Sequence, residues 1–273
     1  MSNRVLVSIA VLLAALTFSP LLRAQPWSTQ AGPVKDTKAP APPRDLTGVR
    51  DTQEGIQATG ARNNPSDGKH DLHFTPLGEA TFKAHKPGWG VTGVPVALVN
   101  DPVDICDPQG FPRVWLHNLR TTQIVQTPDQ MLILYEFYKV WRSIWTDGRE
   151  LPKDADDEPR WYGYSVGKWV SDDTFVAETT GLDERTWLDN TGRPHSKDLR
   201  IEERFHRVDR DTLELTVTIV DPAMYTKPWD ALDKLALHLQ PRGFDIMENM
   251  CSPSDTAEYN KSIGTPAGDG TRK

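Results

Sequence analysis

The sequence predicts an all-β protein whose core is a single up-and-down antiparallel barrel of about eight strands. Between about residues 114 and 239, runs of strand length follow one another, and turn-forming residues bound each run. Residues 213–219 alternate strictly between apolar and polar side chains, a period of two that a helix cannot produce. Twelve of the 22 prolines fall between residues 25 and 113, which indicates a preceding irregular arm with at most a short helix. The alternative to a closed barrel is an open sheet or a two-sheet sandwich.

Residues 1–24 have the pattern of a signal peptide that is cleaved from the mature chain. Arg4 supplies a positive charge, residues 5–18 are nearly all apolar, and Ala24 is a small residue of the kind that signal peptidase favours. The apolar run would extend roughly 21 Å as a helix, which is short of a bilayer core of about 30 Å. We therefore expect a periplasmic or secreted protein with no membrane span after signal cleavage.

Residues 25–112 are predicted to form a proline-rich linker and a wrapping arm. The first part, residues 25–68, combines prolines with Gly-rich and Asn-rich spacers and is typical of disordered chain. A short helix is expected over Leu77–Lys86, because Pro87 would end it. The remaining boundaries place the barrel domain at residues 113–251 and a polar tail at residues 252–273.

The barrel prediction depends on eight runs that have the composition of strands. Short turns such as Thr127-Pro128-Asp129 join consecutive runs, which favours antiparallel pairing of sequence neighbours. Closing such a meander removes its exposed edges. The expected strands are residues 123–126, 131–140, 141–146, 161–170, 174–180, 199–208, 212–220 and 231–239.

The chain has two cysteines, Cys106 and Cys251, one on each side of the predicted strands. In an oxidising compartment they can form a single intramolecular disulfide. Such a bridge would close a long loop, which the chain-entropy model credits with up to roughly 4–5 kcal/mol of stability. The alternative is a pair of buried thiols.

Charge and motifs exclude several function classes. The formal net charge of −7 argues against sequence-independent nucleic-acid binding, which needs a basic surface. The sequence has no Gly-rich phosphate loop, zinc spacing or haem-attachment motif, so neither a cofactor nor a metal is expected. His70 and His73 lie three apart with His85 downstream, but in a predicted loop they are interpreted as solvent-exposed polar residues. The acidic run at residues 154–158 lacks the spacing of a calcium loop.

The first candidate site is a cluster of aromatic and charged residues on the middle strands. Strand alternation would point some of these rings into the barrel, where they could hold an apolar ligand with a polar or charged end. The alternative is a packed aromatic core crossed by structural ion pairs, because eight-stranded barrels occur both hollow and filled. The candidate ligand-binding residues are Tyr138, Arg142, Trp145, Trp161, Tyr164, Trp169, Glu178, Glu202 and Arg204.

The second candidate site is the loop at residues 187–196, which is longer than a tight hairpin needs. It carries Asp189 and His195, which could act as an acid–base pair if the carboxylate orients the imidazole at a cavity. In that enzyme alternative, a lyase, isomerase or hydrolase, Arg142 would stabilise an anion. The other interpretation is a structural loop whose polar side chains bond to the backbone.

Seven blocks between about residues 75 and 255 carry a family resemblance. The blocks are residues 106–113 (CDPQGFPR), 141–152 (WRSIWTDGRELP), 161–169 (WYGYSVGKW), 173–181 (DTFVAETTG), 186–196 (TWLDNTGRPHS), 202–205 (EERF) and 221–229 (DPAMYTKPW). Through them the chain resembles a large family of uncharacterised secreted bacterial proteins, common in soil bacteria. The resemblance implies secretion and a lipocalin-like strand order, and it transfers no catalytic residue because no activity is established for the family.

Taken together, these features favour a periplasmic or secreted barrel that binds a small, largely apolar molecule with a polar end. The expected partner is a small-molecule ligand rather than nucleic acid, and the oligomeric state stays open. The enzyme alternative needs Asp189, His195 and Arg142 at one cavity mouth. A third class, an interaction protein tethered by its proline-rich arm, would need a filled barrel and a large exposed apolar patch.

Overall fold

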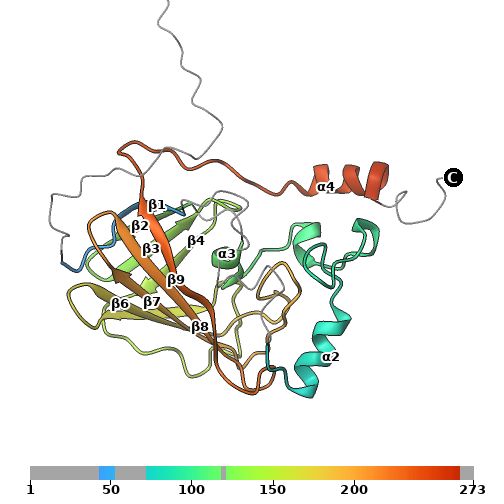
Figure 1. Cartoon of the computed structure of the whole chain (residues 1–273), viewed down its shortest axis with the longest axis horizontal. Helices are drawn as coiled ribbons and strands as arrows, with labels where there is room; N and C mark the ends of the chain where they lie inside the picture. Colours follow the sequence, from blue (N-terminus) through green and yellow to red (C-terminus); the bar gives the residue numbers. More distant parts are fainter. Residues whose placement is uncertain (1–42, 53–71, 118–120, 265–273) are drawn as a thin grey trace, which may run out of the picture. The chain divides into compact units, whose positions relative to one another are not determined.

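The described part of the computed structural model, residues 43–52, 72–117 and 121–264, forms a closed β-barrel whose nine strands are joined in sequence order (Figure 1). The all-β barrel prediction is confirmed, with nine strands in place of about eight. The strands are β1 (Gly48–Asp51), β2 (Thr122–Gln126), β3 (Gln130–Tyr135), β4 (Trp141–Trp145), β5 (Tyr164–Trp169), β6 (Thr174–Thr180), β7 (Arg200–Arg207), β8 (Thr212–Val220) and β9 (Trp229–Leu239).

Alternation of side chains along the strands builds the interior of the barrel. In β8, Leu213, Leu215, Val217 and Ile219 are all completely buried, while the residues between them are partly exposed. The neighbouring strand β7 pairs with it in register, with Ile201 opposite Ile219 and Phe205 opposite Leu215. The period-two pattern in the sequence therefore marks the core-facing side correctly.

The first strand comes from a segment that the sequence assigned to a disordered linker. β1 pairs antiparallel with both β2 and β9, so it closes the barrel. It lies within residues 25–68 and well ahead of the expected domain boundary at residue 113. Its sequence, GVRD, has no alternating apolar pattern, and Arg50, although fully buried, gives no hydrophobic signal. The expectation of disorder is therefore corrected at these four residues.

The barrel departs from antiparallel pairing at one position. β4 and β5 pair in parallel through Trp145 and Val166, whereas the other eight pairings of the barrel are antiparallel. The connection between the two strands, residues 146–163, is long enough to return to the end of the barrel at which β4 began. The expectation of an entirely antiparallel meander is wrong at this junction.

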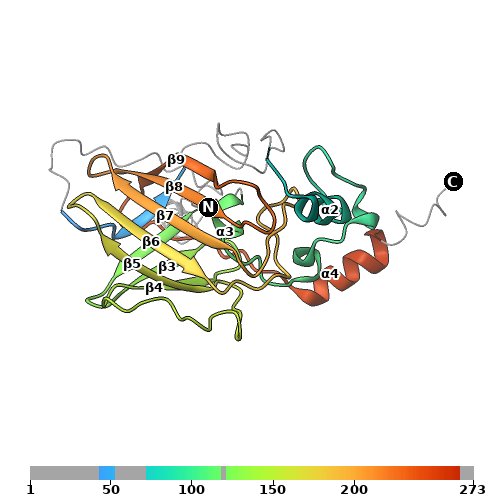
Figure 2. The ribbon, with the colours of Figure 1, turned by 90° about the horizontal axis from the view of Figure 1, so that it is seen from below.

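Short helices occupy the arm and the tail. The predicted helix is present as α2 (Pro76–Ala84), which Thr75 caps at its N-terminus through its hydroxyl group. In Figures 1 and 2, α2 and α4 lie on the same side of the barrel. The other helical segments are η3 (Val96–Leu98), η4 (Pro102–Ile105), α3 (Arg113–Leu116), α4 (Pro253–Tyr259) and η5 (Asn260–Gly264). The predicted polar tail therefore begins with helix.

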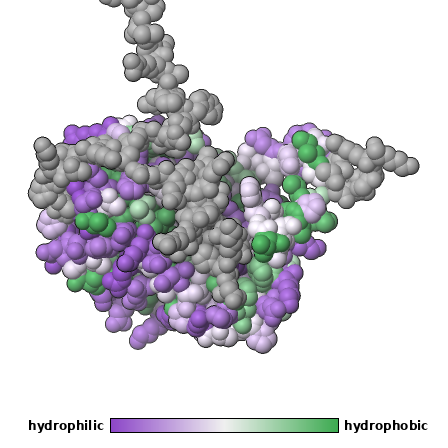
Figure 3. Space-filling view, viewed as in Figure 1, coloured by the Kyte–Doolittle hydropathy of each residue, from purple (hydrophilic) through white to green (hydrophobic). Residues whose placement is uncertain are grey.

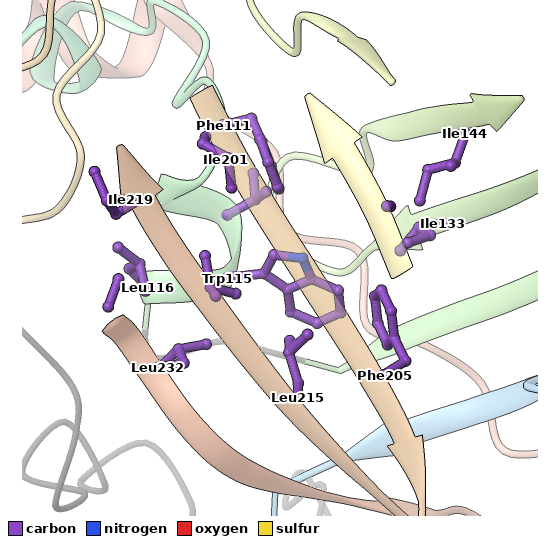
Figure 4. Close-up of a cluster of buried hydrophobic side chains, with 14 of the residues drawn as sticks. Phe111, Trp115, Leu116, Ile133, Ile144, Ile201, Phe205, Leu215, Ile219 and Leu232 are labelled. Carbon is purple, nitrogen blue, oxygen red and sulfur yellow. The ribbon is translucent and has the colours of Figure 1, made fainter. Parts of the chain in front are cut away.

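The short helix α3 places Trp115 in the hydrophobic core, where its ring lies among side chains from several strands (Figure 4). Trp115 is fully buried, and its ring meets Tyr135 and Phe205 edge-on, with ring centroids 5.1 and 6.2 Å apart. Around Trp115, side chains fill the barrel. This agrees with the interpretation of the aromatic residues as a packed core. A ligand running along the barrel axis would have to displace Trp115.

The predicted disulfide between Cys106 and Cys251 is present, with Cα atoms 5.5 Å apart. It joins the residue after η4 to the segment just before α4. Across the described residues, none of the helices has the length and hydropathy that a membrane span requires. Figure 3 shows that hydrophobic residues gather on the side of α2 and α4, while the barrel surface in the same view is largely polar.

Candidate functional site

The strongest candidate site is a slot in the barrel wall between β4 and β5. The two strands meet at Trp145 and Val166, and the chain segments before these two residues diverge. A cavity of about 630 Å³ lies there, within the range of ordinary small-molecule sites. We call it the slot; it is lined by Trp141, Arg142, Ser143, Trp145, Arg149, Glu150, Pro152, Arg160, Trp161, Tyr162, Gly163, Tyr164, Ser165 and Val166.

The slot brings together four of the nine predicted ligand-binding residues. Arg142 and Trp145 come from β4, Tyr164 begins β5, and Trp161 lies in the connection between them. A turn at Gly163 helps to fix this arrangement. Gly163 has a φ of +64°, and a Cβ there would approach the Thr180 carbonyl oxygen to 2.6 Å, so the backbone requires glycine.

Guanidinium groups cover the aromatic rings around the slot. Arg149 lies 3.6 Å from the Trp145 ring centroid, and Arg160 lies 4.0 Å from that of Tyr164. Arg149 also forms an ion pair with Asp147, at 2.7 Å. Arg160 is exposed and has no ion pair within the described chain, so its charge is available to an incoming anion.

Behind the slot, Arg142 belongs to a buried polar network. Its Nη2 donates to Glu203 Oε2 at 2.6 Å, and Trp115 Nε1 donates to Glu203 Oε1 at 2.7 Å. The guanidinium also lies over the Phe111 ring, 3.8 Å from its centroid. Burial lowers the pKa of Arg142, but attraction to the Glu203 carboxylate outweighs it and leaves the pKa raised. Arg142 is therefore a permanent cation.

This network has hydrogen-bonding capacity that protein groups do not use. Within the described chain, Nε and Nη1 of Arg142 and the hydroxyl groups of Tyr135 and Tyr162 make no hydrogen bond of good geometry, although the Tyr135 hydroxyl lies close enough to Arg142 to influence its pKa. Burial raises the pKa of both tyrosines, so both hydroxyls stay neutral. Unsatisfied buried donors are costly, and a cluster of them beside a cavity is a mark of a functional site.

Sequence reasoning missed Glu203 and named its neighbours instead. Glu202 and Arg204 were predicted to rim the ligand, but they lie on the outer face of β7 and pair with each other at 3.4 Å. Alternation could have identified Glu203, because it is in phase with the buried Ile201 and Phe205. The signal available in the sequence was a glutamate at a core-facing position, between the apolar residues Ile201 and Phe205.

The other three predicted ligand-binding residues also lie away from the slot. Glu178 is exposed on the outer face of β6. Trp169 packs edge-on against Phe175 as part of the core, with centroids 5.4 Å apart. Tyr138 lies in the turn after β3, and its hydroxyl donates to the Val103 carbonyl oxygen at 3.4 Å. The aromatic cluster therefore divides between the slot, the core and this turn.

The predicted acid–base pair is not formed. Asp189 accepts hydrogen bonds from Thr191 and from Arg193 Nη1, the latter at 2.6 Å. His195 Nε2 lies 2.8 Å from the Thr186 hydroxyl, and its Nδ1 faces the Ser196 carbonyl oxygen at 3.2 Å. Both side chains are buried, and neither of them lines the slot. The structural interpretation of the 187–196 loop fits these contacts.

The histidines of the arm give no metal site in the described chain. His70 lies outside the described residues, and no group of three or more His, Cys, Asp or Glu side chains elsewhere could hold an ion. His85 instead stacks on Trp187, with ring centroids 4.5 Å apart. Its Nδ1 lies 2.7 Å from the Gly192 carbonyl oxygen, so His85 ties the arm to the 187–196 loop.

Together, the fold and the slot define a closed β-barrel with an aromatic, arginine-rimmed opening in its wall. Comparison with known protein families, curated proteins and solved structures finds no significant match to the chain. The family resemblance carried by the seven sequence blocks therefore stays a prediction.

Proposed function

We propose that the protein binds a small, largely apolar molecule with an anionic end, and that the ligand enters the slot between β4 and β5. The observation that carries this proposal is the buried cation Arg142, with two unused donors, at the back of an aromatic cavity. A ligand oxygen that reached these donors would relieve the cost of leaving them unpaired. The ligand body would pack on the rings of Trp145, Trp161 and Tyr164.

The charges around the slot support an anionic rather than a neutral end. Its charged lining residues are Arg142, Arg149, Arg160 and Glu150. Glu203 balances Arg142 and Asp147 balances Arg149, whereas Arg160 and Glu150 form no ion pair in the described chain. Arg160 is the exposed arginine of the slot that has no ion pair in the described chain, so its donors are available to the anionic end of the ligand. Arginine suits this role because its planar donors match carboxylate, sulfonate and phosphate oxygens.

We also propose that the chain is exported and that the barrel works in the periplasm or outside the cell. The Cys106–Cys251 disulfide supports export, because structural disulfides persist in oxidising compartments. The predicted signal peptide, residues 1–24, lies outside the described residues. The proposal does not use Asp189 and His195 as an acid–base pair, because Asp189 accepts from Arg193 and His195 contacts the Thr186 hydroxyl group.

Native mass spectrometry of the protein, purified without denaturant, tests the proposal. We expect a bound small molecule on the wild-type barrel. Ser143→Trp, which places a bulky ring in the slot, should remove it. Glu178→Trp adds the same ring to the exposed outer face of β6 and should retain the ligand. A wild-type protein free of small molecules, or equal retention in both variants, contradicts the proposal.

A further inference from the structure

A second, larger cavity lies between the arm and the C-terminal helices. It has a volume of about 1430 Å³, more than the roughly 300–1,000 Å³ of ordinary small-molecule sites. We call it the cleft. Residues of η4, such as Val103 and Ile105, line it on one side, and Thr256 and Tyr259 of α4 on the other. The Cys106–Cys251 disulfide joins these two sides, so it holds the width of the cleft.

Gln109 gives the cleft an unused hydrogen-bonding group. Its side chain lines the cleft and is 1 % exposed, yet both Oε1 and Nε2 lack a hydrogen-bond partner in the described chain. The next residue, Gly110, has a φ of +73°, and a Cβ there would meet the Thr186 side chain at 2.4 Å. The backbone is therefore held firmly, and the amide needs a group that both donates and accepts.

A buried ion pair beside Gln109 presents further planar polar groups. Arg113 donates to both carboxylate oxygens of Asp101, at 2.8 and 2.5 Å. The same guanidinium donates twice to Asn190 Oδ1, at 3.1 and 3.0 Å. Asp101, Arg113 and Asn190 all line the cleft. Because these groups fix one another, they form a rigid polar wall with its charge neutralised.

Other parts of the cleft lining are aromatic. Phe137 stacks on Tyr138 with ring centroids 4.5 Å apart, and Trp89 is 68 % exposed at the cleft. Tyr138 has a φ of +61°, an uncommon conformation for a bulky residue and one that recurs where side chains clamp ligands. Burial raises the pKa of Tyr138 to about 12, so its hydroxyl stays protonated.

The remaining charges of the cleft disfavour an anion. Asp104, Asp107 and Asp255 line it without an ion pair in the described chain. Its second arginine, Arg185, pairs with Asp183 at 2.6 Å. A neutral polyhydroxylated ligand can stack on the rings, donate hydrogen bonds to the carboxylates, and both donate to and accept from the Gln109 amide.

We propose that the cleft is a second binding site, separate from the slot, for a neutral oligosaccharide, with the Gln109 amide as its central hydrogen-bonding group. Vicinal hydroxyl groups both donate and accept, as that amide requires, and the apolar faces of sugar rings stack on aromatic side chains. The size of the cleft fits several sugar units.

Ligand-detected NMR and calorimetry on the full-length protein test this site with maltohexaose, cellohexaose and N-acetylchitohexaose as probes. We expect at least one of them to bind, and Gln109→Leu to weaken that binding tenfold or more. The same substitution should leave the melting temperature unchanged or higher, because it removes two unsatisfied polar atoms. If Gln109 had only a structural role, replacing it would lower the melting temperature.

Two controls separate this site from general effects. Gln240→Leu replaces another buried glutamine that has an unsatisfied Oε1 but does not line the cleft, so saccharide binding should be unchanged. Ser143→Trp closes the slot. It should also leave saccharide binding at the cleft unchanged, whether or not the slot binds a ligand. The proposal is overturned if no neutral hexasaccharide binds, if Gln109→Leu binds as wild type does, or if hexagalacturonate, spermidine or hexaglycine binds instead.

Discussion

At the scale of single residues, the barrel interior is organised around one buried carboxylate. Glu203 is completely buried and accepts hydrogen bonds from Trp115 and Arg142. The carboxylate therefore holds the Trp115 ring in place and keeps the Arg142 cation beside the slot. A buried ion pair of this kind contributes little net stability compared with apolar residues, but breaking it is costly.

Replacing Arg142 alone is therefore expected to be severe. Arg142→Met would leave Glu203 charged and buried without its cation, and we expect the free energy of unfolding to fall by about 3–5 kcal/mol. The double variant Arg142→Met with Glu203→Gln removes both charges and should recover a substantial part of that loss. Urea denaturation measures both values, and a double variant no more stable than the single one would contradict this role of the pair.

A second residue, His195, is predicted to make stability depend on pH. Burial lowers its pKa, and the pKa values of His85 and His238 are lowered for the same reason. Below pH 6.5 the unfolded chain binds protons that the folded chain resists, so stability is lost as the pH falls. Each such histidine contributes at most about 1.4 kcal/mol per pH unit.

His195→Gln should flatten this dependence. Glutamine can still hydrogen-bond to the Thr186 hydroxyl group but cannot titrate. Between pH 7.5 and pH 5.5, the variant should lose less stability than the wild-type protein, by up to about 1.4 kcal/mol for each pH unit below about 6.5. Thermal unfolding across that range decides the matter, and parallel curves for the two proteins would show that His195 is not responsible.

At the scale of elements, the closure of the barrel depends on its shortest strand. β1 has four residues, yet it pairs with β2 on one side and β9 on the other. Without it, both neighbours would present unpaired backbone groups along an exposed edge. Arg50 of β1 reinforces the closure, because its Nη1 donates to the Asp211 carbonyl oxygen at 3.3 Å.

Truncation tests the importance of β1 directly. A chain that starts at residue 72 lacks this strand and should aggregate or melt at a clearly lower temperature. A chain that starts at residue 43 keeps β1 and serves as the control, with a melting temperature close to that of the mature protein. Equal melting temperatures for the two truncated chains would restore the interpretation of this segment as a linker.

The sequence predicted the elements that have strong local patterns. The alternation in β7 and β8 identified core-facing residues, and Pro87 marked the end of the short helix, which begins one residue before the predicted Leu77. β1 could not be predicted, because its stability comes from pairing with distant strands rather than from its own composition. The parallel contact of β4 with β5 is a property of the long connection, whose path no local pattern specifies.

The site was predictable to a similar degree. Aromatic residues marked the right stretch of chain, but composition cannot say which rings line a cavity and which pack in the core. Trp161 and Trp169 illustrate this, because the first lines the slot and the second packs on Phe175. Glu203 was missed because the candidate residues Glu202 and Arg204 were taken from the solvent-facing positions of the strand, and the buried position between them was not considered.

At the scale of the whole molecule, the barrel and its attached segments offer two cavities of opposite character. The slot is aromatic and basic, whereas the cleft is lined by neutralised polar groups and acidic residues. A filled barrel interior separates this protein from barrels that hold a ligand along their axis. Its binding capacity therefore lies in the wall of the barrel and beside it.

The measurement that tests the central claim most directly is a paired fluorescence titration with anilinonaphthalene sulfonate and its uncharged analogue phenylnaphthylamine. Both have the same aromatic body, and they differ in the anionic end that the slot is proposed to recognise. Wild-type protein should bind the sulfonate more tightly. Arg160→Gln should weaken sulfonate binding by roughly three- to tenfold and leave the analogue unchanged. Equal affinity for the two probes, or an Arg160→Gln variant that binds both as the wild-type protein does, would contradict an anion-selective slot.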